Sequence, residues 1–405
     1  MSTAELLGKL HSIAAVDVHG KRVLIRTDLN VPASGGEVTD ATRIERLLPT
    51  LRDLTQRGAK VVILSHFGRP KGAPDPQYSL RPVANKLASM MQGTTVLFGE
   101  DCIGPLADVV VAQLQPGQIA VLENLRFHKG EEKNDPDFAG ALAKLGDIYV
   151  NDAFSVSHRA HASTEALARL LPAYAGPSMM AEIEALKLSC DHPERPVAAI
   201  IGGSKISTKI DVLVHLVKKM DYLIVGGGMA NTFLYAKKIG VGRSLCEPGL
   251  VETVDTILSQ AAESGCRIVL PVDAVVAREL KANTHTETVP VGEVPDDMMI
   301  LDAGPRSVEA FKQCIEKCKT LLWNGPVGAF EIPPFGEATF ALAREAAKLT
   351  EAGKLRTVAG GGDTVAALNA AGVTDKFSYV STAGGAFLEW LEGRTLPGVA
   401  ALARS

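Results

Sequence analysis

The sequence has no long apolar run of the kind that crosses a membrane. No segment approaches the roughly 18 consecutive apolar residues of a spanning helix, and residues 1–10 carry Glu5 and Lys9 where a secretory signal would be apolar. We therefore expect a cytoplasmic protein with no membrane partner.

An excess of one charge is also missing. The 42 Lys and Arg residues are balanced by 46 Asp and Glu residues, and the formal net charge is -4. Proteins whose main partner is nucleic acid usually carry concentrated positive charge. This composition is that of an ordinary globular protein, and we expect no nucleic-acid partner.

Closely paired cysteines are absent as well. The 6 cysteines are scattered and form no C-x-x-C pair, which favours reduced thiols. Cys314 and Cys318 would share one face of a helix, but a zinc site needs further Cys or His ligands nearby. Packing is the favoured interpretation of this pair, and metal binding is the alternative.

Familiar nucleotide-binding signatures are missing too. The chain has no G-x-x-x-x-G-K-[ST] P-loop, and residues 226–231 (GGGMAN) end in Asn231 where a G-x-G-x-x-G fingerprint needs its last glycine. The H-R-D loop of protein kinases is not found either. These absences argue against a P-loop ATPase, a Rossmann dehydrogenase and a protein kinase.

What the sequence does contain is an alternation of short apolar runs and segments with helical periodicity. The runs predict buried strands of a parallel sheet, at residues 23–25, 61–64, 119–122, 148–150, 197–201, 222–225, 267–270, 321–323 and 355–358. Between the first two runs, apolar residues recur from Ile44 to Leu54 with the spacing of one helix face, although Pro49 would interrupt that helix. The fold class is therefore α/β, with doubly wound parallel sheets.

The length of 405 residues favours two domains. Leu171-Pro172 and Gly176-Pro177 interrupt the alternation, a helical stretch follows at 179–188, and a proline-marked link leads into a fresh strand. We predict one lobe at 1–175, a connecting helix and hinge at 176–192, and a second lobe at 193–392. Residues 393–405 form a C-terminal tail.

Glycine clusters follow three strands of the second half, at 202–205, 226–228 and 360–364. Carboxyl-end turns of a parallel sheet are where ligands collect, so these turns predict a nucleotide cleft. In the last cluster, glycines precede Asp363 and Thr364 at a helix start, where amide groups attract phosphate and an aspartate can hold Mg²⁺. A tight turn with Asp363 as a helix cap is the equal alternative. Lys205 and Lys209 could face the same phosphates, or simply be solvated.

Basic residues follow the strands of the first half. They include Arg26, His66, Arg69, Arg126, His128, His158, Arg159 and His161, and Arg43 begins the first long helix. Guanidinium groups bind phosphate and carboxylate through paired hydrogen bonds, so the cluster predicts a site for a small polyanion. Each residue also has a plainer interpretation: Arg26 could pair with Asp28, His128 could lie on the surface, and His158 and His161 resemble a metal pair without a third ligand.

Eight motifs occur together in the order and spacing of one known family. They are residues 26–32 (RTDLNVP), 65–70 (SHFGRP), 123–127 (ENLRF), 158–161 (HRAH), 202–205 (GGSK), 226–230 (GGGMA), 323–328 (WNGPVG) and 360–364 (GGGDT). Through them the chain resembles phosphoglycerate kinase along essentially its whole length. The resemblance implies reversible phosphoryl transfer between 1,3-bisphosphoglycerate and ADP, giving 3-phosphoglycerate and ATP.

The resemblance also implies roles in the first lobe, which would bind the phosphoglycerate. Asp28 and Asn30 would bond the glycerate hydroxyl and carboxyl region, and Arg43 would reach the acyl-phosphate end and stabilise the moving group. The non-transferred phosphate would be held by His66, Arg69, Arg126 and Arg159.

The second lobe would bind Mg-ADP or Mg-ATP. The resemblance implies that Lys205 faces the transferred phosphoryl group, that Asp363 holds Mg²⁺, and that Glu331 accepts the ribose hydroxyls. The nucleotide phosphates would lie by Lys209, Asn324, Gly361, Gly362 and Thr364, and the adenine by Gly226 and Gly227. Gly384 and Gly385 resemble the last glycine turn of the family, beside the transferred group.

A kinase of this kind, usually a monomer, would close an interlobe cleft by hinge bending to exclude water. Its tail after Gly393 would return to the first lobe, as in the family.

Two other classes remain for comparison, a two-lobed binding protein for a phosphorylated metabolite and a nucleotide-linked dehydrogenase. A binding protein would not need three glycine turns, and the G-x-G-x-x-G fingerprint of a dehydrogenase is missing from the sequence.

Overall fold

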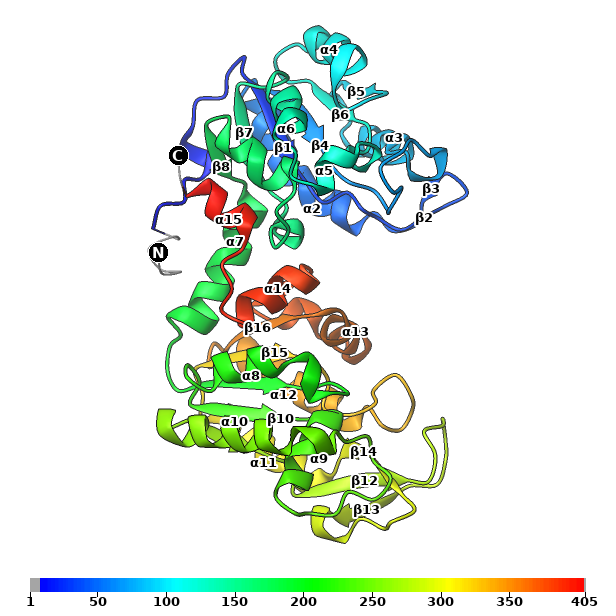
Figure 1. Cartoon of the computed structure of the whole chain (residues 1–405), viewed down its shortest axis with the longest axis vertical. Helices are drawn as coiled ribbons and strands as arrows, with labels where there is room; N and C mark the ends of the chain where they lie inside the picture. Colours follow the sequence, from blue (N-terminus) through cyan, green and yellow to red (C-terminus); the bar gives the residue numbers. More distant parts are fainter. Residues whose placement is uncertain (1–7, 404–405) are drawn as a thin grey trace. The chain divides into compact units, whose positions relative to one another are not determined.

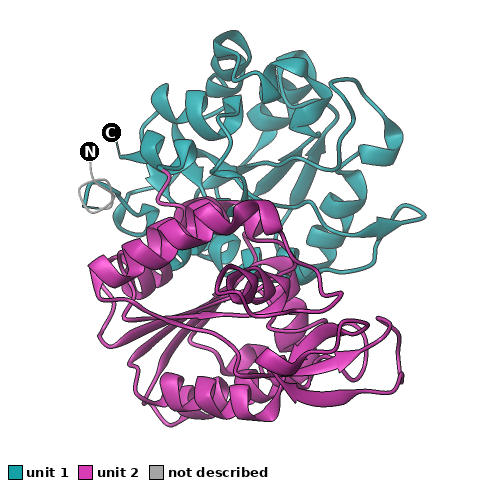
Figure 2. Ribbon diagram, turned by 60° about the horizontal axis from the view of Figure 1, so that its bottom comes forward, with its two compact units in different colours: residues 1–183, 395–405 teal, residues 184–394 magenta. Residues whose placement is uncertain are grey.

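The computed structural model describes residues 8–403, which form two compact units (Figure 2). The first unit contains the described residues up to Ile183 together with those from Thr395 onward, and the second runs from Glu184 to Arg394. The chain thus passes between the units twice, once within the helix α7 (Pro177–Leu186) and once before the C-terminal segment. No helix in the described residues is both long and apolar enough to span a bilayer.

The first unit is built on a six-stranded parallel sheet with the order β5-β6-β4-β1-β7-β8 (Figure 1). Its strands are β1 (Arg22–Arg26), β4 (Lys60–Leu64), β5 (Val96–Gly99), β6 (Ile119–Leu122), β7 (Ile148–Asn151) and β8 (Ala173–Ala175), and a small hairpin joins β2 (Ala33–Ser34) to β3 (Glu37–Val38). Its other helices are α2 (Thr42–Gln56), α3 (Arg81–Met90), α4 (Gly104–Gln113), α5 (Lys129–Glu132), α6 (Pro136–Ala143) and α15 (Pro397–Leu402).

Both faces of this sheet are buried, which explains the unbroken apolar runs in the sequence. Val23 and Ile25 of β1 point into a core cluster with α2 and α3, and Leu24 between them is also fully buried. Helix α2 continues through Pro49, contrary to the expected interruption. The proline is exposed, while Ile44, Leu47, Leu48, Leu51 and Leu54 stay buried along one face. Burial of that face offsets the lost backbone hydrogen bond.

The second unit repeats the plan with the strand order β11-β10-β9-β15-β16-β17, again fully parallel. Its strands are β9 (Val197–Ile201), β10 (Tyr222–Val225), β11 (Arg267–Val269), β15 (Thr320–Asn324), β16 (Arg356–Gly360) and β17 (Tyr379–Ser381). Its helices are α8 (Ile210–Leu216), α9 (Gly227–Ala236), α10 (Val251–Ser264), α11 (Pro305–Glu316), α12 (Glu337–Glu351), α13 (Gly362–Ala371) and α14 (Gly384–Leu391). The predicted α/β class with two doubly wound parallel sheets is confirmed.

A three-stranded antiparallel sheet was not predicted. It pairs β12 (Asp273–Ala277) with β13 (Glu287–Pro290) and β14 (Met299–Ala303), and it has its own small core around Val276 and Met298. Helices α9 and α11 contact its strands.

Candidate active site

The sheet of the first unit reverses its winding direction between β1 and β7. From β1 the chain continues to β4 on one side, and from β7 it continues to β8 on the other. The carboxyl ends of such neighbouring strands frame a crevice where ligands bind in parallel sheets. Arg26 ends β1 and Asn151 ends β7 at this point.

Arg26 is buried here and uses its donors within the protein. Its Nε donates to Ser163 Oγ at 2.9 Å, one Nη donates to the carbonyl of Thr27, and the other lies 3.2 Å from His66 Nδ1. The alternative that Arg26 pairs with Asp28 is not seen, because Asp28 forms its ion pair with Arg43 at 2.8 Å.

The positive charges of four arginines from separate segments lower the pKa of the same buried histidine. Burial, together with the charges of Arg26, Arg126, Arg159 and Arg43, holds the pKa of His66 well below its usual range. Burial and three of these arginines also lower the pKa of His161 to about 4. Neutral histidines amid so much positive charge indicate a site that is prepared for an anion.

Unlike the buried Arg26, Arg126 has guanidinium donors that none of the described residues satisfies. Its side chain is 5% exposed, its Nη1 donates to Gly68 O at 2.8 Å, and its Nε lies 3.5 Å from Glu132 Oε1. Its Nη2 is buried without a hydrogen-bond partner among the described residues. Leaving a buried charged donor unused is costly, and a phosphate or carboxylate would satisfy it.

Asp28, Asn30 and Arg43 are linked to this cluster by hydrogen bonds. Asp28 Oδ2 accepts from Ser155 Oγ at 2.5 Å, and Arg43 donates to the Asn30 carbonyl at 3.1 Å. Asn30 Oδ1 accepts from the amide of Gly68 at 2.8 Å, and the carbonyl of Gly68 accepts from Arg126 Nη1. The structure therefore brings these three predicted residues together with the arginines.

The two remaining predicted arginines are more accessible. Arg159 is half-buried and donates from Nε to His158 at 3.3 Å. Arg69 is exposed after β4, and it forms no side-chain hydrogen bond or ion pair within residues 8–403.

Sequence reasoning missed the acid that balances the cluster. Glu131 is fully buried in α5, where its carboxylate accepts from the Ser163 hydroxyl at 2.5 Å and from the Ser163 amide at 3.0 Å. Burial raises the pKa of Glu131, and the charge of Arg26 opposes that rise. In the sequence this residue lies in KGEEK at 129–133, which looks like a solvated charge run.

In the second unit the winding direction reverses between β9 and β15, and Lys209 lies at their carboxyl ends. Its Nζ donates to the carbonyl of Gly202, which follows β9, at 2.6 Å, and to that of Asn324, the last residue of β15, at 3.2 Å. Burial lowers the pKa of Lys209 to about 8, and Asp363 acts against that shift. Lys205, by contrast, is exposed.

The turn from β16 into α13 has the geometry of an anion site. Val365 N makes the first helical bond to Gly361 O, so the amides of Gly362, Asp363 and Thr364 precede the hydrogen-bonded part of the helix. Gly361 has a φ of +98°, and a Cβ there would lie 2.6 Å from Asn324 Nδ2. That position requires glycine.

Side chains from β15 and α13 hold this turn in place. Asn324 Nδ2 donates to Gly360 O at 2.8 Å, and Thr364 Oγ1 accepts from Gly325 N at 2.7 Å. Asn324 Oδ1 is buried without a partner among the described residues.

A cavity of about 360 Å³ opens next to these turns. Gly227, Gly228, Leu234, Val327 and Leu301 give it apolar walls, and Glu331 and Asp363 are among its few charged groups. Gly226 is not part of the lining but packs against Val327, where a Cβ would come within 2.5 Å of a side-chain carbon. Size and lining suit a flat heterocycle with a charged tail.

Asp302 is a buried acid of this cavity that the sequence did not reveal. Burial raises its pKa to about 7, although it accepts hydrogen bonds from the amides of Ala338 and Ala303. Its hydrogen bond with Ala338 anchors the start of α12. Nothing in the neighbouring sequence distinguishes Asp302 from an ordinary surface aspartate.

Asp363 could hold a magnesium ion. Its exposed carboxylate lies at the cavity beside the α13 amides, and Mg²⁺ in phosphate sites commonly takes one or two carboxylates, phosphate oxygens and water. The donors present here fit a magnesium ion.

Gly384 and Gly385 begin α14 after β17, at the same edge of the sheet, with Gly385 exposed.

Comparisons with known proteins agree along the whole chain. The family model described as phosphoglycerate kinase matches residues 13–394. A phosphoglycerate kinase of Methylorubrum extorquens (strain PA1) is 62% identical over 385 residues, covering 95% of this chain and 96% of that protein. One from Allorhizobium ampelinum is 61% identical over 388 residues, covering 96% and 97%.

Solved structures give the same result. The structure of phosphoglycerate kinase from Coxiella burnetii has a TM-score of 0.90 at 41% identity, covering 97% of this chain and 98% of that one. The enzyme from Pyrococcus horikoshii has a TM-score of 0.78 at 30% identity, with the same coverage. The chain therefore belongs to the phosphoglycerate kinase family, and it transfers a phosphoryl group reversibly between 1,3-bisphosphoglycerate and ADP in glycolysis, as a phosphotransferase with a carboxyl acceptor.

Proposed function

We propose that the arginine cluster of the first unit binds 3-phosphoglycerate or 1,3-bisphosphoglycerate, and that the cavity and glycine turns of the second unit bind Mg-ATP or Mg-ADP. The observation that carries the first assignment is the buried, partly unsatisfied guanidinium of Arg126 beside His66. With Arg69 and Arg159 these residues hold the non-transferred phosphate. Asp28 and Asn30 orient the glycerate, and Arg43 reaches its reacting end.

In the second unit Gly227 and its apolar neighbours enclose the adenine, and Glu331 accepts the ribose hydroxyls. Lys209, Asn324 and the amides of Gly361, Gly362 and Thr364 hold the phosphate chain. Asp363 holds Mg²⁺, which neutralises phosphate charge when bound. Gly226 acts indirectly, because its missing side chain lets Val327 pack beside the slot.

The chemistry needs position and charge more than it needs a base. In the ATP-consuming direction the nucleophile is a carboxylate, which is ionised near neutral pH. Arg43, Lys205 and the amides at Gly384 and Gly385 neutralise charge on the transferred group in the transition state. Because the transferred atom must meet its acceptor in line and away from water, the two units close during turnover.

The enzyme works as a cytoplasmic monomer in this proposal. Closure predicts a smaller radius of gyration in small-angle X-ray scattering when both substrates are added. An unchanged radius with saturating substrates would contradict it.

The assignment of Lys205 is tested by kinetics. Lys205→Ala should lower kcat by about 100-fold or more, as loss of one transition-state contact does in other enzymes, with little change in the Kd for 3-phosphoglycerate. Lys354→Ala removes a lysine that is also exposed and that precedes β16, at the end of the strand opposite the turn into α13, and it is the matched control. Equal losses in kcat and in 3-phosphoglycerate affinity would remove Lys205 from this role.

The assay itself couples ADP formation to NADH oxidation, with 3-phosphoglycerate, Mg²⁺ and ATP supplied. Only a kinase forms ADP and an acyl phosphate here. A binding protein would give no turnover, and a dehydrogenase would oxidise NADH even when ATP is left out, which a reaction without ATP reveals.

A further inference from the structure

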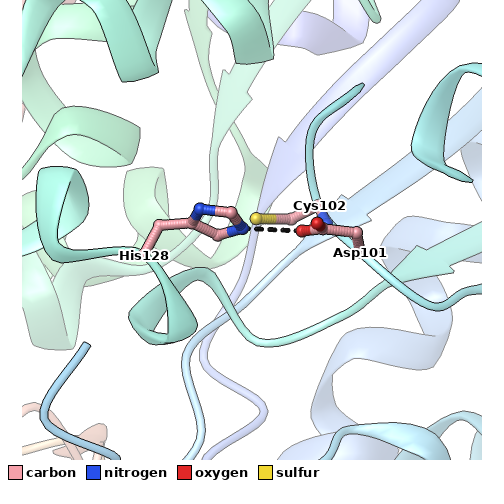
Figure 3. Close-up of side chains that lie close together, drawn as sticks. All are labelled: Asp101, Cys102 and His128. Carbon is pink, nitrogen blue, oxygen red and sulfur yellow. Dashed lines mark hydrogen bonds and ion pairs between the residues drawn. The ribbon is translucent and has the colours of Figure 1, made fainter. Parts of the chain in front are cut away.

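A cysteine, a histidine and an aspartate of the first unit converge outside the site described above. Asp101 and Cys102 lie between β5 and α4, and His128 lies between β6 and α5. Because β5 and β6 are neighbouring parallel strands, their following segments meet at one edge of the sheet. Figure 3 shows the three side chains pointing toward one another from these two segments.

The three side chains offer ligand atoms within 4.8 Å of one another. His128 Nε2 and Asp101 Oδ1 are 2.7 Å apart, and Asp101 Oδ1 also accepts from the amide of Cys102 at 2.6 Å. Within residues 8–403, no other three His, Cys, Asp or Glu side chains are grouped in this way. We propose that Asp101, Cys102 and His128 form a binding site for a divalent transition-metal ion of the zinc class.

The donor set selects this class of ion. Zinc binds thiolate, imidazole and carboxylate together, and three protein ligands with one water is a common arrangement. Magnesium and calcium prefer oxygen ligands alone, so they would be poor occupants. Zinc bonds of about 2.0 to 2.3 Å place tetrahedral ligand atoms about 3.5 Å apart. Side-chain movements of about 1 Å would therefore form the site.

Burial and packing suit an ion that enters from one side. Cys102 is fully buried, whereas the side chains of His128 and Asp101 are 29% and 36% exposed. The ring of Phe138 stacks on His128 with centroids 5.2 Å apart, which restrains the imidazole. The thiol thus forms the closed end of the site and the two other ligands face the entry.

The surroundings carry negative charge. The carboxylates of Asp101, Glu131 and Glu123 all act electrostatically on Cys102, and a bound cation would offset their repulsion of a thiolate. On binding, the thiol proton leaves to solvent, and the single proton of the neutral His128 ring resides on Nδ1, so that the lone pair of Nε2 binds the metal. With Zn²⁺, one thiolate and one carboxylate, the site is neutral.

The site does not depend on the assignments of the catalytic residues. His128 and Asp101 also have a simpler role, as a hydrogen bond between two segments. That role requires neither a thiol at 102 nor any affinity for metal, and this difference makes the proposal testable.

The experiment uses the full chain without a histidine tag, freed of metal and titrated with Co²⁺ in the absence of nucleotide. We expect one Co²⁺ per chain with a near-ultraviolet thiolate charge-transfer band, and displacement of Co²⁺ by Zn²⁺ but not by excess Mg²⁺. Cys102→Ser should abolish the band, and His128→Asn should weaken binding by at least tenfold. Cys246→Ser alters a half-buried cysteine of the second unit and should leave the band intact.

Two results would overturn the proposal. One is a wild-type chain that shows no charge-transfer band at saturating Co²⁺, and the other is a band that persists in Cys102→Ser. Circular dichroism without metal establishes that each variant is folded. Should Cys102→Ser fail that check, the partly exposed His128→Asn decides the question, and unchanged Co²⁺ affinity in it would count against the site.

Discussion

At the scale of single residues, the buried arginines differ in whether the protein satisfies their hydrogen-bond donors. Arg26 is satisfied by Ser163 and Thr27, and Ser163 is in turn held by Glu131. Arg126 keeps an unused donor. The internal partners fix the position of the guanidinium groups, and in the proposed function the unused donor of Arg126 binds substrate. Preorganised charge of this kind needs little rearrangement when the ligand arrives.

Lys209 provides a prediction about pH. Its pKa is lowered to about 8 by burial, and a bound phosphate raises the pKa of a neighbouring ammonium group. The nucleotide complex therefore holds the lysine proton more tightly than the free enzyme, so affinity for ADP is full below pH 8 and falls as pH rises through 8. Between pH 7 and pH 9 the loss should approach about tenfold, measured by calorimetry.

The control for this prediction is Lys209→Arg, whose guanidinium stays charged throughout that range. Asp302 also lines the cavity, and burial raises its pKa to about 7, but its contribution is the same in both proteins. Only the difference between them reports Lys209. Parallel pH profiles for the two proteins would contradict the prediction.

The basic residues at strand ends could be recognised from sequence because arginines are conspicuous after apolar runs. Their acidic counterparts could not. Glu131 and Asp302 matter because they are buried, and burial is a property of the folded chain. A glutamate in KGEEK looks the same whether it is solvated or enclosed.

At the scale of elements, the nine predicted strands are all present within a residue or two of their expected ends. They were predictable because central parallel strands are buried on both faces and therefore uniformly apolar. The missed strands lie at sheet edges or in the small antiparallel sheet. β5 is only half-buried along most of its length, and β13 is mostly exposed, so their sequences lack that uniform pattern.

The turn from β16 to α13 allows a matched pair of glycine substitutions. Gly361→Ala places a Cβ in a strained backbone region and 2.6 Å from Asn324 Nδ2, so we expect a loss of about 2 to 4 kcal/mol in unfolding free energy. It should weaken nucleotide binding as well. Urea denaturation with and without ADP provides both measurements.

Gly362→Ala is the neighbouring control. A Cβ at Gly362 meets no atom within 4 Å, and the residue begins α13. Stability should be unchanged or rise by up to about 1 kcal/mol, because alanine favours helix over glycine. If both substitutions destabilised equally, the special conformation of Gly361 would not be the cause.

At the scale of the whole molecule, the C-terminal segment belongs to the first unit although the second unit precedes it in the chain. Leu396, Val399 and Leu402 are each completely buried there. The amide of Gly398 donates to the carbonyl of Ser157 at 2.8 Å. Since Ser157 lies two residues before Arg159, the tail supports the segment that carries a predicted substrate ligand.

This arrangement predicts that a tail mutation will destabilise one unit selectively. Leu402→Ala removes a fully buried side chain and should lower the stability of the first unit by about 2 to 5 kcal/mol. Leu170→Ala removes a leucine of the same unit that is 51% exposed, and it should change little. Both tryptophans of the chain, Trp323 and Trp390, lie in the second unit.

The location of the tryptophans makes the two units distinguishable in one titration. Tryptophan fluorescence reports unfolding of the second unit, whereas far-ultraviolet circular dichroism reports both. In Leu402→Ala the dichroism should show an earlier first transition while the fluorescence midpoint stays that of the wild type. ADP should then raise the fluorescence midpoint alone, because a ligand stabilises the unit that binds it. A common shift of both signals would mean that the units unfold as one cooperative body, and that the tail supports the whole chain instead of the unit in which its leucines are buried.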